Sequence, residues 1–340
     1  MRRLKLPLGT VVLDPAGPAL SEDDRRRLRH PAAGGVILFA HNYENPEQLQ
    51  ALTDEISRLR EPELPICVDH EGGRVQRFAL GFTAIPPMRR LGVLWDRDRE
   101  TARRAARAAG TVIAAELGAH GVDFSFTPVL DLDYGSSAVI GHRAFHYDPI
   151  AVGALAAQLI EGLAGGGMAA VGKHFPGHGF AAADSHVAVP TDPRSAKDIF
   201  RKDVAPYRAA IKAGLAAVMP AHVIYPQADA EPAGYSKYWL QQVLRGDLGF
   251  EGLIFSDDLA MEGASTAGGI PERAIAALAA GCDMVLLCQN PAGQDQLLDS
   301  LASTPLAVPE RLERLRRKGG RDYRKSVAYR GALEALRDIP

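Results

Sequence analysis

The feature that most constrains the fold of this chain is a short apolar segment followed by a longer helix-like segment, repeated along the sequence. Segments that are apolar on both faces and alternate with helices are typical of parallel strands covered by helices. A closed (β/α)₈ barrel needs eight such strands and about 250 residues or more. We therefore predict a single (β/α)₈ TIM-type barrel, with a doubly wound open sheet as the alternative. The eight predicted strands cover residues 9–13, 35–39, 65–69, 124–130, 169–173, 216–220, 252–256 and 283–287.

The 340 residues are predicted to form one domain, because no proline- or serine-rich linker, fixed-period repeat or low-complexity tract divides them. Helix signals lie between the predicted strands: Asn45 and Asp148 are each followed by a proline, and Gly281 stands where a helix should end. From about residue 309 the chain is rich in arginine and lysine. We interpret residues 1–340 as a single catalytic domain with a basic, solvated helical extension at its C-terminal end.

Composition excludes several function classes. The formal net charge of −2 gives no reason to expect a nucleic-acid partner. No run of about eighteen apolar residues is present, so no membrane partner is expected. Cys67, Cys282 and Cys288 form no C-x-x-C pair, which argues against a disulfide framework and fits a reducing compartment. Because no secretory signal follows the basic N-terminus, we predict a cytoplasmic protein, and we expect it to act as a monomer.

Unusual polar residues follow most of the predicted strands, whereas the strands begin mainly with small or apolar residues. Active sites of (β/α)₈ barrels lie at the C-terminal ends of the strands. This asymmetry therefore favours an enzyme or a sugar-binding site over a purely structural barrel. The residues at these ends are Asp69-His70-Glu71, Asp131-Leu132-Asp133, Lys173-His174, His222, Asp257-Asp258 and Gln289-Asn290.

The segment after the fifth predicted strand reads KHFPGHG at 173–179 and DSH at 184–186, and it combines titratable groups with small residues. Histidine titrates near neutral pH and is suited to proton transfer or metal binding. Asp184 stands two residues before His186, where its carboxylate can accept the imidazole N–H and hold one tautomer. We interpret this pair as functional, whereas His178 and His222 are predicted to be structural.

Two other readings stay open at this point. A metal hydrolase would bind its ion through His174, His178, His186 and His222 with Asp69 or Asp257, but Lys173 would place a positive charge beside that ion. A non-catalytic sugar-binding barrel is the third reading. The glycine-rich runs match no nucleotide-binding fingerprint, and the G-x-S-x-G motif of serine hydrolases is absent. We therefore predict no cofactor and no metal.

Several motifs together resemble those of family 3 glycoside hydrolases, over most of the chain from Leu13 to about Pro291. The run VDHEGGRVQRF at 68–78 resembles the VDxEGGRVxR motif of that family, and KHFPGHG with DSH resembles its KHFPGHGxxxxDSH loop. The run IFSDDL at 254–259 looks like its nucleophile motif. Further similar runs are VIGHRAF at 139–145 and MPAH at 219–222. One departure is His142, where the family often has an acidic or small polar residue.

The resemblance implies roles for individual residues. Asp257 is the nucleophile of a retaining glycosidase, His186 is the acid and base, and Asp184 orients His186. The resemblance also implies that five residues bind the substrate, although Asp69 and Arg77 could instead form an ion pair with each other. Glu71 and Arg74 are interpreted as structural. The five predicted substrate-binding residues are Asp69, Arg77, Arg143, Lys173 and His174.

The chain looks most like the single-domain bacterial branch of the family, the β-N-acetylglucosaminidases of cell-wall recycling. That likeness implies a small carbohydrate substrate, N-acetylglucosamine linked to anhydro-muramyl peptides. A histidine in place of a carboxylate would not repel phosphate, so phosphorolysis by the same site is the alternative to hydrolysis.

Overall fold

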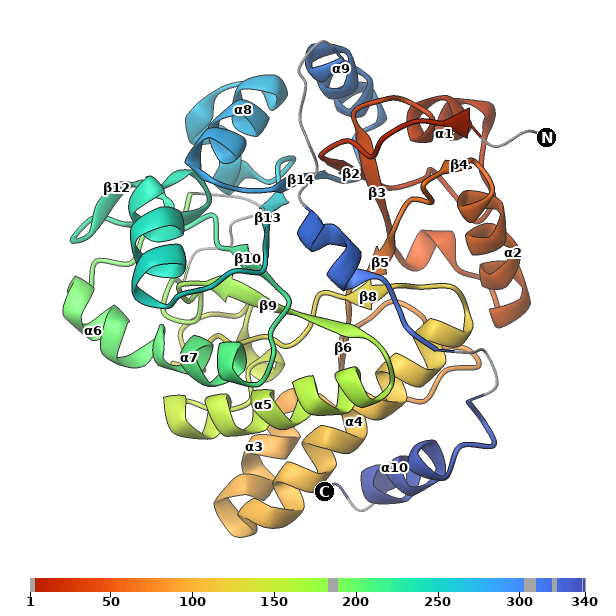
Figure 1. Ribbon diagram of the computed structural model, residues 1–340. Helices are drawn as coiled ribbons and strands as arrows, with labels where there is room; N and C mark the ends of the chain where they lie inside the picture. The colour runs from red at the N-terminus through yellow and green to blue at the C-terminus, as the bar shows by residue number, and fades with distance from the viewer. Residues whose placement is uncertain (1–3, 183–188, 303–309, 320–322, 338, 340) are drawn as a thin grey trace.

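The structure of the protein is a computed structural model that describes residues 4–182, 189–302, 310–319, 323–337 and 339. Its centre is a closed barrel of parallel strands in the order of the sequence, closed by pairing of the last strand with the first (Figure 1). The barrel strands are β2 (Val11–Leu13), β3 (Ala33–Leu38), β5 (Ile66–Val68), β8 (Phe124–Ser125), β9 (Ala169–Phe175), β10 (Ala217–Pro220), β13 (Leu253–Asp258) and β14 (Met284–Leu287).

The predicted barrel is confirmed, and each of the eight predicted segments contains one of these strands or most of it. The fourth segment is the least regular. Strand β8 ends at Ser125. Beyond it the contact with β9 continues through a bridge from Val129 to Lys173, and the carbonyls of Thr127 and Pro128 accept the N–H groups of Val171 and Lys173. The open-sheet alternative is wrong, because Val285, Leu286 and Leu287 of β14 pair in register with β2.

Helices surround the barrel as an outer ring (Figure 1). The predicted cap signals act as expected: Asn45 accepts the N–H of Gln48, and Asp148 accepts that of Ile150. The helices are α1 (Glu22–Leu28), α2 (Pro46–Ser57), α3 (Met88–Arg97), α4 (Arg99–Ala119), α5 (Pro149–Gly165), α6 (Ala196–Lys202), α7 (Ala205–Lys212), the π-helix η4 (Tyr238–Asp247), α8 (Ile270–Ala280), α9 (Pro291–Leu301) and α10 (Val327–Arg337). Short 3₁₀ turns are η1 (Ala40–Asn42), η2 (Gly141–Arg143), η3 (Ala233–Tyr235), η5 (Glu262–Ala267) and η6 (Glu310–Leu315).

Three small two-stranded sheets lie outside the barrel in the described part of the chain, and one of them shapes the C-terminal end of the barrel. Strands β6 (His70–Gly72) and β7 (Val75–Gln76) form an antiparallel hairpin directly after β5, so Asp69, Glu71 and Arg77 all come from this hairpin region. The other two sheets pair β1 (Leu4–Lys5) with β4 (Arg60–Glu61) and β11 (Ile224–Tyr225) with β12 (Asp229–Pro232).

The barrel interior is packed with aromatic rings. Phe124, Phe126 and Phe255 are buried, and their ring centroids lie 5.2 to 5.7 Å apart. Two of the three pairs pack edge to face, which is the favourable geometry for aromatic rings. The Nζ of Lys173 lies 5.9 Å from the centroid of the Phe126 ring, so this aromatic layer supports the polar residues above it.

The opposite end of the barrel is covered by the C-terminal region. Leu312 and Leu315 of η6 are buried there, and η6 lies across the middle of the ring of strands (Figure 1). The N–H of Lys318 donates to the carbonyl of Gly167, just before β9, over 2.7 Å. The polar strand ends are therefore left as the open end. None of the helices in the described ranges combines the length and the apolar composition that a membrane span requires.

Candidate active site

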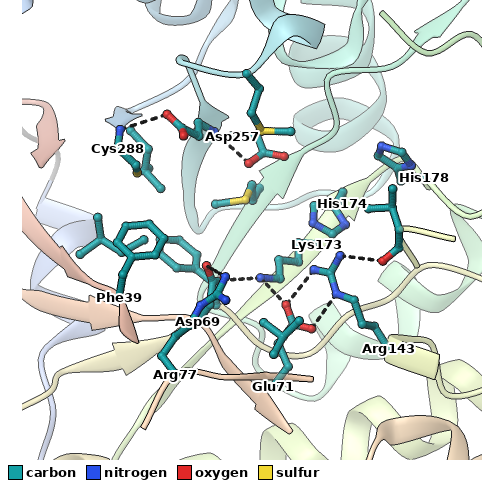
Figure 2. A pocket seen from close by; sticks show the side chains of 18 of the residues that line it. Phe39, Asp69, Glu71, Arg77, Arg143, Lys173, His174, His178, Asp257 and Cys288 are labelled. Atoms are coloured by element: carbon teal, nitrogen blue, oxygen red, sulfur yellow. Dashed lines mark hydrogen bonds and ion pairs between the residues drawn. The ribbon is translucent and has the colours of Figure 1, made fainter. Parts of the chain in front are cut away.

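A cavity of about 620 Å³ lies at the C-terminal end of the barrel strands (Figure 2). It is lined by residues from several of the strand ends and from the β6–β7 hairpin. The five predicted substrate-binding residues and the predicted nucleophile all contribute to its lining. They are Asp69, Arg77, Arg143, Lys173, His174 and Asp257.

One side of the cavity is a buried cluster of opposite charges. The Nζ of Lys173 lies 2.6 Å from Asp69 Oδ1 and 2.6 Å from Glu71 Oε1. Arg143 makes a bidentate pair with Glu71, with Nε–Oε2 at 2.9 Å and Nη2–Oε1 at 2.8 Å. Arg77 is more loosely placed, with Nη2 3.7 Å from Asp69 Oδ2. Asp69 and Arg77 therefore pair with each other and also line the cavity, so the internal ion pair does not exclude a role in substrate binding.

The cluster fixes the charge state of its members. Burial acts to raise the pKa of Glu71, but Arg143 and Lys173 outweigh it and hold that pKa well below its usual range. Burial acts to lower the pKa of Lys173, and here Asp69 and Glu71 prevail and raise it. Two cations and two carboxylates thus coexist in a site where an unpaired charge would be costly. Such fixed charges are strong partners for sugar hydroxyls.

His174 stands beside this cluster, and a carboxylate behind it holds its ring. Its Nδ1 lies 2.7 Å from Asp131 Oδ2, and the other oxygen of Asp131 accepts the N–H of His178 over 2.7 Å. Burial acts to raise the pKa of Asp131, but His174 and His178 outweigh it and keep the carboxyl ionised. His178 is buried, and burial together with His174 lowers the pKa of its ring.

Asp257 lies at the end of β13, facing the cavity (Figure 2). Its Oδ1 accepts the N–H of Asp258 over 2.8 Å. Burial acts to raise its pKa, but the opposing effects of His174, His222, that N–H and Lys173 hold the pKa below the usual value for aspartate. Asp257 is therefore ionised at neutral pH, as a carboxylate nucleophile must be.

The neighbouring carboxyl, Asp258, has a different environment. Its Oδ1 accepts the N–H groups of Ala260 and Cys288, each over 3.0 Å, so it joins β13 to the end of β14. Asp258 does not cap the following 3₁₀ turn, because the N-cap of η5 is Met261. Burial raises the pKa of Asp258 to about 7. The fold therefore lowers the pKa of Asp257 and raises the pKa of its neighbour Asp258.

A model of the family described as the glycosyl hydrolase family 3 N-terminal domain matches residues 5–317 of this chain. The chain belongs to glycosyl hydrolase family 3. A β-hexosaminidase from Methylobacillus flagellatus is 60% identical over 296 residues, which cover 87% of this chain and 85% of that protein. This chain is therefore a glycosidase, a β-N-acetylhexosaminidase.

Solved structures agree with this assignment. NagZ from Neisseria gonorrhoeae in complex with N-trifluoroacetyl-D-glucosamine is 48% identical, covers 98% of both chains and superposes with a TM-score of 0.91. The same NagZ in complex with a zinc ion is 47% identical, covers 98% of both chains and has a TM-score of 0.89. In the parts of this chain that the structure describes, no group of three histidine, cysteine, aspartate or glutamate side chains is arranged to hold a metal ion.

The predicted acid–base pair, Asp184 and His186, lies outside the residues that the structure describes. The described chain stops at Ala182 and resumes at Val189. The chain on either side is well anchored. The hydroxyl of Tyr225 donates to the carbonyl of Gly177 over 2.9 Å, and the N–H of Asp192 donates to the carbonyl of Ile224 over 2.8 Å.

The sequence marks Asp131 only as a polar residue at a strand end. Its contact with His174 joins positions 43 apart in the sequence, so no local pattern indicates it. Glu71, interpreted as structural, is 1% exposed and pairs with both Arg143 and Lys173. Its place in the charged cluster follows from the β6–β7 hairpin, which turns the chain back over the strand ends.

Proposed function

We propose that this enzyme is a retaining exo-β-N-acetylglucosaminidase that uses Asp257 as its nucleophile. The observation that carries the proposal is the position of Asp257, an ionised carboxylate in the wall of the cavity that Lys173 and His174 also line. The N-trifluoroacetyl-D-glucosamine bound to the similar NagZ structure supports an N-acetylglucosamine unit as the sugar.

In the first step, an oxygen of Asp257 forms a bond to the anomeric carbon as the bond from that carbon to the leaving oxygen breaks. His186 donates its proton to the leaving oxygen, and Asp184 stabilises the ring as it changes charge. The product is a covalent glycosyl-enzyme. In the second step, water attacks the anomeric carbon, His186 takes its proton, and Asp257 departs. Two inversions leave the β configuration unchanged.

The charged cluster is proposed to bind the terminal, non-reducing sugar. Asp69 accepts hydrogen bonds from hydroxyl groups, whereas Lys173, Arg143 and Arg77 donate to hydroxyl or amide oxygens. These contacts hold the anomeric carbon against Asp257, which supplies the positioning part of catalysis. The enzyme is also proposed to remove single terminal units rather than to cut within a chain, since the charged cluster around Lys173 and Glu71 forms one side of the cavity.

The proposed substrate is β-1,4-linked N-acetylglucosamine on anhydro-muramyl peptides, in the cytoplasm, as part of cell-wall recycling, with the enzyme acting as a monomer. This finer assignment rests on the likeness to the single-domain bacterial branch. Mass spectrometry of the products from a GlcNAc-anhydro-MurNAc tripeptide checks it. Release of free N-acetylglucosamine supports the assignment, whereas an unchanged disaccharide peptide contradicts it.

The stereochemical claim is tested by proton NMR during the first minutes of turnover of an aryl N-acetyl-β-glucosaminide. The β anomer is expected to appear first and then to mutarotate. Early appearance of the α anomer would contradict the retaining mechanism. A parallel reaction in phosphate buffer separates hydrolysis from phosphorolysis, because a glycosyl phosphate in place of free sugar would show that phosphate is the acceptor.

A further inference from the structure

Within the described residues, the carboxylate of Asp131 makes three hydrogen bonds, and all three go to one short segment of chain. It accepts the ring N–H of His174 through Oδ2 at 2.7 Å, the backbone N–H of His174 through Oδ1 at 3.3 Å, and the backbone N–H of His178 through Oδ1 at 2.7 Å. The Asp131 side chain is 0% exposed. A buried carboxylate with three donors on one segment fixes both the backbone and the side chain of that segment.

The arrangement determines where the His174 ring carries its proton. An ionised carboxylate only accepts hydrogen bonds, so the nitrogen that faces it, Nδ1, must be protonated. The other ring nitrogen, Nε2, lies on the opposite edge of the ring. His174 also lines the cavity (Figure 2), so its ring lies between Asp131, which Nδ1 contacts, and the substrate space.

We propose that Asp131 is a positioning residue that acts through His174. It holds the ring in the Nδ1–H form and in one orientation, so that Nε2 is presented to the sugar beside Asp257. The proposal rests on the proposed function in so far as the cavity binds the sugar there. The tautomer that it assigns to His174 is independent of any substrate.

The backbone around Asp131 makes the contact rigid. The N–H of Leu130 donates to the carbonyl of Lys173 over 2.6 Å. A Cβ atom on Gly179 would lie 1.8 Å from the carbonyl oxygen of Leu132, so the two segments run in close contact. The distance between Asp131 and His174 is therefore set by the backbone and not by flexible side chains. Removing the partner that orients a metal-binding histidine typically changes activity by about 10- to 100-fold, and we expect a comparable effect for the partner of His174.

The first test is nitrogen-15 NMR of the parent enzyme labelled at histidine. The His174 resonances are expected to show a proton on Nδ1. An unprotonated Nδ1 would overturn the proposal, and this measurement needs neither a variant nor a substrate. Its outcome is thus separate from the outcome of the stereochemical experiment, which tests the proposed function.

The second test replaces Asp131 by asparagine. In Asp131→Asn the Oδ1 atom still accepts the backbone N–H of His178, but an amide N–H now faces the ring and requires an unprotonated Nδ1. The expected result is a shift of the His174 proton to Nε2 and a fall of about 100-fold in kcat/KM for 4-nitrophenyl N-acetyl-β-glucosaminide. A kcat/KM equal to that of the parent would overturn the proposal.

A control and a double variant separate positioning from a general loss of structure. Asp123 is a buried carboxylate just before β8, accepts the backbone N–H groups of Ile66 and Arg317, and has no histidine among the hydrogen-bond partners in the described residues. Asp123→Asn is expected to keep kcat/KM within about threefold of the parent value. In a His174→Ala background, Asp131→Asn is expected to have almost no further effect. A full loss of about 100-fold in that background would contradict an action through His174.

Discussion

The structure predicts that the charge of Glu71 matters for stability. Glu71 is 1% exposed, makes a bidentate pair with Arg143 and contacts Lys173 at 2.6 Å. In Glu71→Gln the fold keeps both cations but loses one of the two carboxylates that neutralise them. Removing one partner of a buried ion pair costs about 3–5 kcal/mol, since the charge left behind is buried without compensation.

This cost can be converted into a melting temperature. An unfolding entropy of about 2.1 cal/mol/K per residue amounts to roughly 0.7 kcal/mol/K for a chain of this length. Glu71→Gln is therefore expected to lower Tm by about 4–7 °C at pH 7. Because folding depresses the pKa of Glu71, its charge stabilises the parent above the unfolded-state pKa of about 4.3, and the stabilisation is lost as pH falls below that value. The difference in Tm between parent and variant should then shrink.

The assay is thermal unfolding followed by circular dichroism from about pH 7 to about pH 3, a range that spans the unfolded-state pKa of glutamate. The control is Glu55→Gln. Glu55 pairs with Arg25 at 2.7 Å, but its side chain is 36% exposed, so its loss should cost less than about 1 kcal/mol. The reasoning would be refuted if Glu71→Gln melted within about 1–2 °C (roughly 1 kcal/mol) of the parent at neutral pH. It would also be refuted if the two glutamine variants behaved alike.

Three further predictions follow from other residues. Burial raises the pKa of Asp258 to about 7, so ionisation of this carboxyl destabilises the fold as pH rises from about 3.8 to about 7. The Tm of Asp258→Asn should therefore exceed that of the parent by more at about pH 8 than at about pH 4.5, and an equal difference at both pH values would contradict this. Arg194 pairs with the buried Asp192 and Asp203 at 2.6 and 2.9 Å, so Arg194→Met should lower the free energy of unfolding in urea by about 3–5 kcal/mol. Arg201→Met removes an exposed pair and should lower it by less than about 1 kcal/mol, and similar losses in the two variants would contradict this. Dialysis against a chelator should leave kcat/KM unchanged, and a loss restored by zinc would favour the metal-hydrolase reading.

The barrel was predictable from the sequence because its signals are local. Each strand is a short apolar run, and cap residues such as Asn45 and Asp148 mark where helices begin. The strand-end rule predicts that Asp69, Lys173 and Asp257 lie at one end of the barrel, and the structure brings them together around one cavity.

The remaining features depend on contacts between distant parts of the chain. The sequence carries no sign that Asp131 reaches His174, or that Glu71 pairs with Arg143 72 positions away. The resemblance to family 3 selects Asp257 over Asp258, but the local sequence gives no sign that the two carboxyl groups have different environments. Their pKa values diverge because Asp257 lies near His174, His222 and Lys173, whereas Asp258 is buried among acidic neighbours such as Asp14. Only the folded arrangement of several strands produces that difference.

Trapping the covalent intermediate tests most directly whether Asp257 is the nucleophile. The enzyme is incubated with an activated 2-deoxy-2-fluoro glycoside, digested, and the labelled peptide is sequenced by mass spectrometry. One sugar per chain is expected, attached to Asp257 in the peptide that contains Ile254 to Leu259. A label on Asp258 or Asp131, or an inactivated enzyme without a covalent sugar, would contradict this assignment.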